Sequence, residues 1–334
     1  MNEPMTAARP AVPSLSCVMP AFNEAESLPR VVPAVLEHLL QLSPRVELIL
    51  IDDGSSDATA VVATDLCQRH PQIVLLQLAR NFGKEAALAA GLQATHGDVV
   101  VIMDADGQHP VELVDEMLRL WRDDGVDDVY AVRSRQGQSR LYAFGVRVFY
   151  RLINWGMRFR VPPDAGDFRL LDRRVVQVLN ALPERHRFTK GLYAWAGFKS
   201  VAIPYDPLAR VAGHSNFGWR ASLAFGATGL LSFTAAPLRF FGLIGLALAL
   251  VSIGYGAWVV IEHFVWGARV RGYATIVTGI MFLSGVQLLA IGLLAEYVAR
   301  IYDEVKGRPL YWIARRVGTG LAPREHDSGL HSHP

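Results

Sequence analysis

Two long runs of uncharged residues in the last third of the chain constrain its architecture most. The first extends from Phe240 to about Ile261 and the second from Ala274 to Ala295, and neither contains a charged side chain. An α-helix needs about 20 apolar residues to cross a bilayer, whereas buried helices of soluble domains rarely stay apolar on every side. The sequence therefore predicts two transmembrane helices, over residues 238–263 and 273–298.

The basic residues around these runs predict their orientation. Arg239 precedes the first run, and the loop between the runs offers only Arg269 and Arg271. A larger basic group follows the second run, including Arg300, Lys306, Arg308, Arg315 and Arg316. Loops rich in Lys and Arg stay in the cytoplasm. We therefore expect both ends of the chain, and the folded domain between the N-terminus and the first span, on the cytoplasmic side.

The segments outside the spans have distinct compositions. Residues 1–13 lack the apolar core of a signal peptide and are predicted to form a disordered cytoplasmic arm. Residues 213–237 end at a proline and are predicted to form a juxtamembrane helix lying on the membrane, with a third span as the alternative. Residues 299–334 are expected to form a cytoplasmic segment that ends in a disordered tail.

From Leu15 to about Val132 the chain alternates short β-branched runs with stretches of helical periodicity, and a less regular region follows Gln136. The expected strands are "LSCVMP", "VELILIDDGS", "IVLLQLAR", "DVVVIMDAD" and "DVYAVR". This alternation indicates an α/β domain with a mostly parallel sheet that helices cover on both faces. The formal net charge of +2 lacks the basic excess of a nucleic-acid-binding protein, so no nucleic-acid partner is expected.

Polar residues follow four of the expected strands, in the segments "PAFNE", "DDGSSD", "ARNFGKE" and "DADGQHP". Ligands of open parallel sheets bind at the carboxyl ends of the strands, so this edge is the candidate site. The first strand is not followed by GxGxxG, which excludes a dinucleotide-binding domain. The Gly-Lys pair in "NFGKEAA" lacks the other residues of a phosphate-binding loop.

The segment "DADGQHP" places two aspartates one residue apart at the end of an apolar run. Side chains alternate between the faces of a strand, so Asp104 and Asp106 are expected on the same side. Two such carboxylates repel each other unless a positive charge lies between them. A simple strand-to-turn exit is the alternative, because Asp and Gly are common in turns.

Seven segments together resemble the family 2 glycosyltransferases that charge polyprenyl phosphate, a branch that includes bactoprenol glucosyltransferases and dolichol-phosphate mannose synthases. They are "PAFNE", "DDGSSD", "RNFGKEAALAAG", "DADGQHP", "DAGDFRL", "RFTKGLYAWAGF" and "EYVARIYDEVKGRPLY". The resemblance extends from about Ser14 to Tyr311. It implies a GT-A, Rossmann-like catalytic domain over residues 14–212. Gly107 and His109 depart from the usual family form, which is closer to "DADLQDP".

The resemblance also implies roles for residues at the strand ends. Asp104 and Asp106 would hold a divalent cation, Mg or Mn, against the diphosphate of a nucleotide sugar, and Gln108 would lie near this metal. Carboxylate and phosphate oxygens are the ligands that such hard cations favour. The residues implied to bind the nucleotide are Pro20, Glu24 and Asp53, which would line the base and ribose pocket, and Asp52 beside it.

The acceptor phosphate calls for a cationic clamp, and arginine suits this role by its forked geometry. Arg210 matches the family arginine before the membrane segment, and Arg133 at the fifth strand end is a second candidate. A lipid phosphate is already an anionic nucleophile, so the reaction needs no strong general base. Asp164 and Asp167 in "DAGDFRL" are therefore expected to orient the acceptor or to lie beside the metal.

The resemblance implies an inverting glycosyltransferase of the bacterial inner membrane, which moves glucose from UDP-glucose onto undecaprenyl phosphate. GDP-mannose or a modified sugar donor is the alternative within the same chemistry. A membrane scaffold that only binds a nucleotide sugar is an alternative of another class. A processive polysaccharide synthase is disfavoured because its QxxRW signature is missing. The sequence leaves open the lipid chain length and the oligomeric state, which includes a homo-oligomer.

Overall fold

The centre of the protein is an eight-stranded sheet with the strand order β7-β5-β6-β4-β1-β2-β3-β8. The computed structural model describes residues 9–133, 159–160, 162, 165–185, 187–208, 236–266 and 272–322. The strands are β1 (Leu15–Ala21), β2 (Val46–Asp52), β3 (Ile73–Leu78), β4 (Val99–Ile102), β5 (Asp128–Arg133), β6 (Ala165–Asp172), β7 (Ser200–Tyr205) and β8 (Ile313–Val317).

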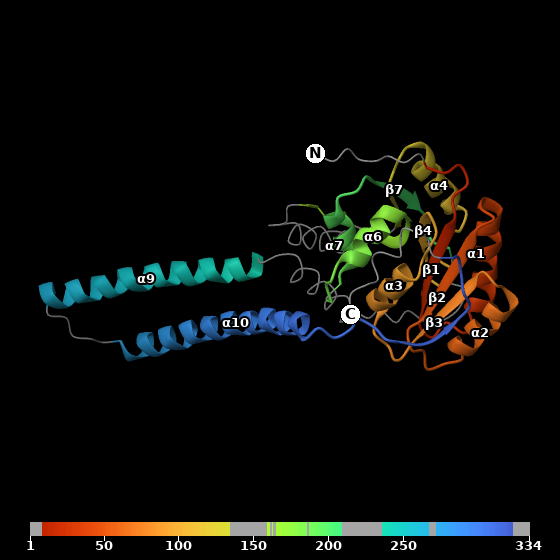
Figure 1. The fold of residues 1–334 in the computed structure, drawn as a ribbon. Coiled ribbons are helices and arrows are strands. Elements are labelled where there is room, and N and C mark those ends of the chain that lie inside the picture. The colour runs from red at the N-terminus through yellow and green to blue at the C-terminus, as the bar shows by residue number, and fades with distance from the viewer. Residues whose placement is uncertain are drawn as a thin grey trace.

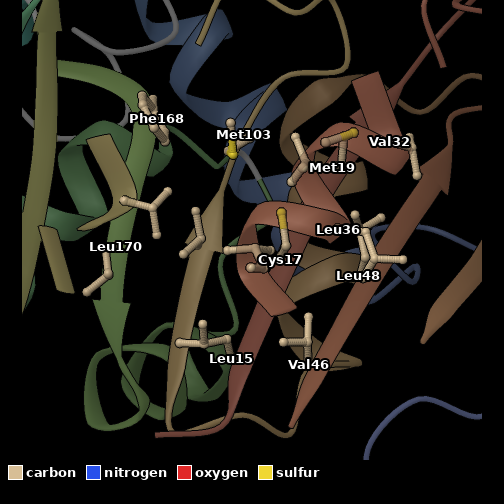
Figure 2. Close-up of a cluster of buried hydrophobic side chains, with 14 of the residues drawn as sticks. Leu15, Cys17, Met19, Val32, Leu36, Val46, Leu48, Met103, Phe168 and Leu170 are labelled. Atoms are coloured by element: carbon tan, nitrogen blue, oxygen red, sulfur yellow. The ribbon is translucent and has the colours of Figure 1, made fainter. Parts of the chain in front are cut away.

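Helices cover both faces of this sheet and enclose two apolar cores (Figure 1). One face packs against α1 (Leu28–Leu42), α2 (Thr59–Arg69) and α4 (Leu113–Asp123). The other face packs against α3 (Lys84–Gln93), α6 (Arg173–Ala181) and α7 (Thr189–Ala196). Figure 2 shows the first core, in which side chains from β1, β2 and β6 meet those of α1. The predicted α/β architecture is confirmed.

The sheet is mixed because β6 and β8 run against their neighbours. β1 pairs in parallel with β2 and β4, β2 with β3, and β5 with β7. β6 lies between β4 and β5 and is antiparallel to both. Consequently the first residues of β6 lie at the carboxyl ends of β4 and β5, which is the edge that carries the candidate site.

Two long helices follow the sheet domain, α9 (Ala236–Trp266) and α10 (Tyr273–Lys306). They lie side by side and project away from the domain (Figure 1). The segments Phe241–Trp258 and Thr278–Lys306 are long and apolar enough to cross a membrane, judged by length and composition. Many of their large apolar side chains are exposed, whereas most of those in the strands of the sheet domain are buried. The predicted interfacial helix over 213–237 lies almost entirely outside the described residues.

The chain after α10 returns to the sheet domain. β8 pairs antiparallel with β3, and the amide of Ala79 donates a hydrogen bond of 2.9 Å to the carbonyl of Trp312. The Arg185 side chain donates to the carbonyls of Glu304 and Arg308, at 2.9 and 2.6 Å. The residues expected as a cytoplasmic segment therefore include an edge strand, which the sequence did not predict because "IARRV" holds two arginines.

The N-terminal arm that the sequence predicts over 1–13 contacts the domain from Arg9 onward. The Arg9 side chain donates 2.9 Å to the carbonyl of Val126 and lies 2.6 Å from the carboxylate of Asp127. Its guanidinium also lies 4.9 Å from the ring centre of Trp121. These contacts, which composition does not reveal, hold Arg9 against α4 and the loop that precedes β5.

Candidate functional site

The two aspartates of "DADGQHP" lie in a turn and not on a strand. β4 ends at Ile102, so strand alternation does not place Asp104 and Asp106 on one face, and that part of the expectation was wrong. Gly107 has a positive φ of 75°, which lets the chain turn immediately after Asp106. The Asp106 carboxylate is nearly buried and accepts a hydrogen bond of 3.1 Å from the amide of Gln108.

Asp104 and Asp167 are brought together by the pairing of β4 with β6. In this pairing Ile102 lies opposite Arg169, so two more residues in each direction place Asp104 beside Asp167. The Lys84 ammonium lies between them, 2.6 Å from Asp104 Oδ1 and 2.7 Å from Asp167 Oδ2. A positive charge of the protein itself therefore separates these two acidic residues.

The charges of this cluster depend on one another. Burial would raise the pKa of Asp167, but the nearby Lys84 and Lys190 ammonium groups hold that pKa well below its usual range. Burial would likewise lower the pKa of Lys84, yet Asp167 and Asp104 raise it above its ordinary value. Lys84 and Asp167 therefore both stay ionised near neutral pH. Lys190 Nζ lies 3.7 Å from Asp167 Oδ1 and gives this carboxylate a second cation.

His109 fixes the turn that carries Asp104. Its Nδ1 accepts a hydrogen bond of 3.1 Å from the Asp104 amide. Its ring stacks on Phe168, with ring centres 4.7 Å apart, and meets the edge of Tyr205 at 5.9 Å. Burial lowers the pKa of His109. This histidine, noted in the sequence only as a departure from the family form, joins the turn to β6 and β7.

Arg133 and Gln108 lie on the same side of the site. Arg133 Nη2 donates a hydrogen bond of 3.3 Å to Gln108 Oε1, and the amide of Leu208 donates 3.0 Å to the Gln108 carbonyl. The Gln108 turn therefore connects the ends of β5 and β7. Arg133 lies at the end of β5 with its side chain exposed, where a bound anion could reach it.

The acidic residues after β2 are held by backbone amides. Asp53 accepts hydrogen bonds of 2.8 Å from Phe82 and 2.9 Å from Gly83, which directly precede Lys84. Asp52 accepts 3.0 Å from the amide of Ser55, while its buried Oδ2 has no hydrogen-bond partner among the described residues. Burial raises the pKa of Asp53. The Asp53 carboxylate thus fixes the loop before α3, whereas the Asp52 carboxylate has a buried oxygen that no described residue satisfies.

Gly54 permits this arrangement. Its φ is 63°, and a Cβ atom there would lie 2.3 Å from the carbonyl carbon of Arg80. Only glycine therefore lets the turn after β2 approach the loop after β3 closely. The two loops that flank the sheet edge are in direct backbone contact.

Glu24 and Pro20 lie at the end of β1. Glu24 Oε2 accepts a hydrogen bond of 2.6 Å from the Ser27 hydroxyl, and its amide donates 2.8 Å to Thr59 Oγ1. Pro20 is partly exposed near the end of β1, one residue before Ala21, whose register partner is Asp52. These contacts place the predicted nucleotide residues around the carboxyl ends of β1 and β2.

The described site therefore has two ends along one sheet edge. The residues predicted for the nucleotide lie at the first end: Pro20, Glu24, Asp52 and Asp53. Those predicted for the metal and the acceptor lie at the second end: Asp104, Asp106, Gln108, Arg133 and Asp167. Arg210 and Asp164 lie outside the described residues. Sequence reasoning assigned no role to Lys84 or Lys190, although the segment "NFGKEAA" was noted for its lysine.

A separate hollow lies away from this edge. It has a volume of about 490 Å³ and is bordered by α3, the end of α6 and the chain after α10, including Gln93, Asn180, Arg187 and Tyr311. None of the acidic residues of the sheet edge lines it. The hollow marks the junction between the sheet domain and the returning chain.

Comparisons with known proteins identify the family. Residues 16–179 match the family described as Glycosyl transferase family 2, and residues 236–301 match the GtrB C-terminal hairpin. The chain is 43% identical over 306 residues to a bactoprenol glucosyl transferase of Shigella phage SfX, covering 90% of this chain and 99% of that protein.

Two further relatives show similar coverage. A glycosyltransferase of Synechocystis sp. is 39% identical over 312 residues, which is 93% of this chain and 98% of that protein. A prophage bactoprenol glucosyl transferase homolog of Escherichia coli K12 is 40% identical over 304 residues, which is 90% of this chain and 98% of that protein. The predicted resemblance is confirmed: the chain is an enzyme of the GT-A fold and belongs to glycosyltransferase family 2.

Proposed function

We propose that the protein transfers glucose from UDP-glucose to undecaprenyl phosphate at the cytoplasmic face of the bacterial inner membrane. The observation that carries this proposal is the 43% identity, across 90% of the chain, to a protein named a bactoprenol glucosyl transferase. The two apolar helices support it, because a polyprenyl acceptor stays in the membrane and an enzyme acting on it must reach the bilayer surface.

The acidic end of the site fits a divalent cation. Among the described residues, no three His, Cys, Asp or Glu side chains converge to form a metal cage. Mg²⁺ is commonly held by one or two carboxylates together with the phosphates of the substrate, so two carboxylates suffice for a cation that arrives with its donor. Asp104 and Asp106 would hold Mg²⁺ or Mn²⁺, which would neutralise the diphosphate as UDP leaves.

The remaining residues of the edge would bind and orient the two substrates. Asp52, with its unpartnered oxygen, and Glu24 would contact the nucleotide. Arg133 and Arg210 would hold the acceptor phosphate, because arginine forms paired hydrogen bonds with phosphate oxygens. Of these two arginines, Arg133 is among the described residues, and it lies at the same sheet edge as Asp104.

The transfer exchanges one bond for another. An oxygen of the lipid phosphate attacks the anomeric carbon of the sugar from the face opposite UDP, the bond to the UDP oxygen breaks, and the configuration inverts. The attacking oxygen is already anionic, so no proton has to be removed. Asp167 is bound by two lysines and would orient groups in the site, not act as a base. Asp164 would share this orienting role.

A donor screen tests this function. Membranes containing the protein are incubated with undecaprenyl phosphate and with labelled UDP-glucose, GDP-mannose or modified UDP-sugars, and labelled lipid is extracted. We expect labelled lipid from UDP-glucose only. Labelled lipid from GDP-mannose alone, or from a modified sugar alone, would show that UDP-glucose is not the donor. Binding of a donor without any lipid product would favour a non-catalytic scaffold.

A further inference from the structure

Lys84 occupies a position that the proposed reaction does not yet use. It is the first residue of α3, and its ammonium bridges Asp104 of the β4 turn and Asp167 of β6 at 2.6 and 2.7 Å. Asp104 is one of the two carboxylates assigned above to the divalent cation. Lys84 and that cation therefore compete for the same carboxylate.

The contacts around Lys84 allow its ammonium to leave. Lys190 would continue to compensate Asp167, which it approaches to 3.7 Å. The divalent cation would compensate Asp104. The Lys84 side chain is 37% exposed and carries four flexible methylenes, so its ammonium can turn toward the open edge while its backbone stays fixed.

The backbone of Lys84 is indeed fixed from the other end of the site. Asp53 accepts hydrogen bonds from Phe82 and Gly83, the two residues before Lys84. The base of this lysine is therefore rigid, and only its side chain has alternatives. An ammonium group that can move while its backbone stays fixed is suited to binding a nearby diphosphate, because lysine binds phosphate as a point charge.

We propose that Lys84 is an exchangeable counter-ion, which pairs with Asp104 and Asp167 in the free enzyme and moves to the donor diphosphate when the cation and the nucleotide bind. This inference rests on the proposed donor chemistry. It gives a function to the two short contacts that Lys84 makes with Asp104 and Asp167. It also gives the Gly-Lys pair of "NFGKEAA" a role that differs from a phosphate-binding loop.

Two titrations of the purified full-length protein in detergent test the exchange. The affinity for Mn²⁺ alone is measured from the free-ion signal in electron paramagnetic resonance, and the affinity for UDP at saturating Mn²⁺ by calorimetry. In Lys84→Met we expect Mn²⁺ alone to bind about tenfold more tightly, because a competing positive charge is gone. We expect UDP to bind about tenfold more weakly, because a cation for its diphosphate is gone.

Opposite changes in the two affinities are the result that supports exchange. If both affinities fall together, Lys84 only holds the carboxylates in place, and the proposal is overturned. Unchanged UDP affinity overturns it as well. Lys199→Met is the matched control, because Lys199 is exposed and its ammonium donates to the carbonyl of Asp124, away from the acidic cluster.

Two features keep the test decisive. Lys84→Gln provides a second neutral variant if the methionine variant does not fold, and the same opposite changes are expected. The Mn²⁺ titration needs no nucleotide, so it is independent of the donor. Wild-type protein that binds GDP and not UDP would contradict the proposed donor, and the second titration would then use GDP to test Lys84.

Discussion

The two ends of the site satisfy their carboxylates in different ways. At the end proposed to bind the nucleotide, which we call the nucleotide end, Asp53 accepts two hydrogen bonds from backbone amides, and Asp52 accepts one. At the end proposed to bind the cation, which we call the metal end, Asp104 and Asp167 are paired with the ammonium group of Lys84. Both ends belong to one sheet edge, so the difference arises from their partners and not from the fold.

This difference separates a fixed region from an adjustable one. A backbone amide cannot leave without unfolding its loop, so the nucleotide end is preformed. A lysine side chain can leave when another cation takes its place, so the charge at the metal end can be rearranged during substrate binding. We therefore expect substitutions at the nucleotide end to affect stability most and those at the metal end to affect catalysis most.

The largest effect is expected for Asp106→Asn. The substitution removes a charge from the proposed cation site but keeps an oxygen that can accept the Gln108 amide. Transfer should fall by a factor on the order of a thousand or more, because the charge on departing UDP would lose its stabilisation. Transfer of labelled glucose to polyprenyl phosphate is measured, together with the thermal unfolding midpoint, which should hardly change.

Asp65→Asn is the control for this experiment, because Asp65 is a partly exposed residue of α2 that pairs with Arg69, away from the candidate site. It should leave transfer unchanged. EDTA should abolish wild-type transfer. Full activity of Asp106→Asn, or of the wild type in EDTA, would show that the acidic turn does not bind a catalytic cation.

The next effect is expected for Asp53→Asn, at the fixed end. One of the two amides of Phe82 and Gly83 would then face an amide group and lose its charged acceptor. The cost should be about 2 kcal/mol, which lowers the unfolding midpoint by roughly 4 to 8 °C. An unchanged midpoint with lost UDP binding would instead show that Asp53 contacts the nucleotide directly, as the sequence predicted.

A smaller, pH-dependent effect is expected for Asp167→Asn in metal-free buffer. The lysines hold the pKa of Asp167 below its usual range, in spite of its burial. The ionised carboxylate therefore stabilises the fold above its unfolded pKa of about 3.9, and this contribution is lost as the pH falls toward the folded pKa. The difference in midpoint between wild type and variant should be present at neutral pH and shrink below about pH 4.

The measurement is a series of thermal melts from pH 7 downward, for as long as the protein remains soluble. A midpoint difference that stays constant over this range would mean that the carboxylate charge contributes nothing to stability. In that case the contact between Lys84 and Asp167 would be a weak one, and the adjustable end of the site would have to be ascribed to Asp104 alone.

Whether the sequence predicts a strand depends on the residues that the strand contains. β1 to β5 were predicted because each is dominated by apolar residues. β6 was not, because it contains Arg169, which is buried and pairs with Asp128 at 2.8 Å. Such a charge is typical of a surface segment until its partner is known. β7 and β8 contain Pro204 or exposed arginines and give an equally weak strand signal.

The sequence proposes candidate site residues where they follow strands, and it does not propose those contacts that form where distant segments meet. Asp104 and Asp106 are recognised from one short motif. The contact of Lys84 with Asp167 depends on the insertion of β6 beside β4, which no local pattern reveals. The electrostatic partner of such a carboxylate is therefore harder to predict than the carboxylate itself, because the sheet topology, and not the sequence spacing, brings the two together.

The smallest effect is expected for Glu304→Gln, where α10 meets the sheet domain. Glu304 has both kinds of partner found at the two ends of the site. Its Oε1 accepts a hydrogen bond of 2.8 Å from the Arg185 backbone amide, and its Oε2 lies 3.6 Å from the Arg185 guanidinium. Glutamine keeps an oxygen for the amide, and partly exposed ion pairs contribute about 0 to 1 kcal/mol. Hydrogen exchange of the amides over residues 304–313 should therefore change less than about fivefold.

Arg185→Ala removes more contacts than Glu304→Gln, because the Arg185 side chain also donates hydrogen bonds to the carbonyls of Glu304 and Arg308 at the end of α10. It should speed exchange over the same amides by about ten- to a hundredfold, while UDP binding stays unchanged. If Glu304→Gln has the larger effect, charge holds the returning chain to the domain. If Arg185→Ala has the larger effect, hydrogen bonds to backbone carbonyls hold the returning chain. This junction is then fixed by backbone groups, as Asp53 is, and not by an exchangeable ion pair of the kind proposed for Lys84.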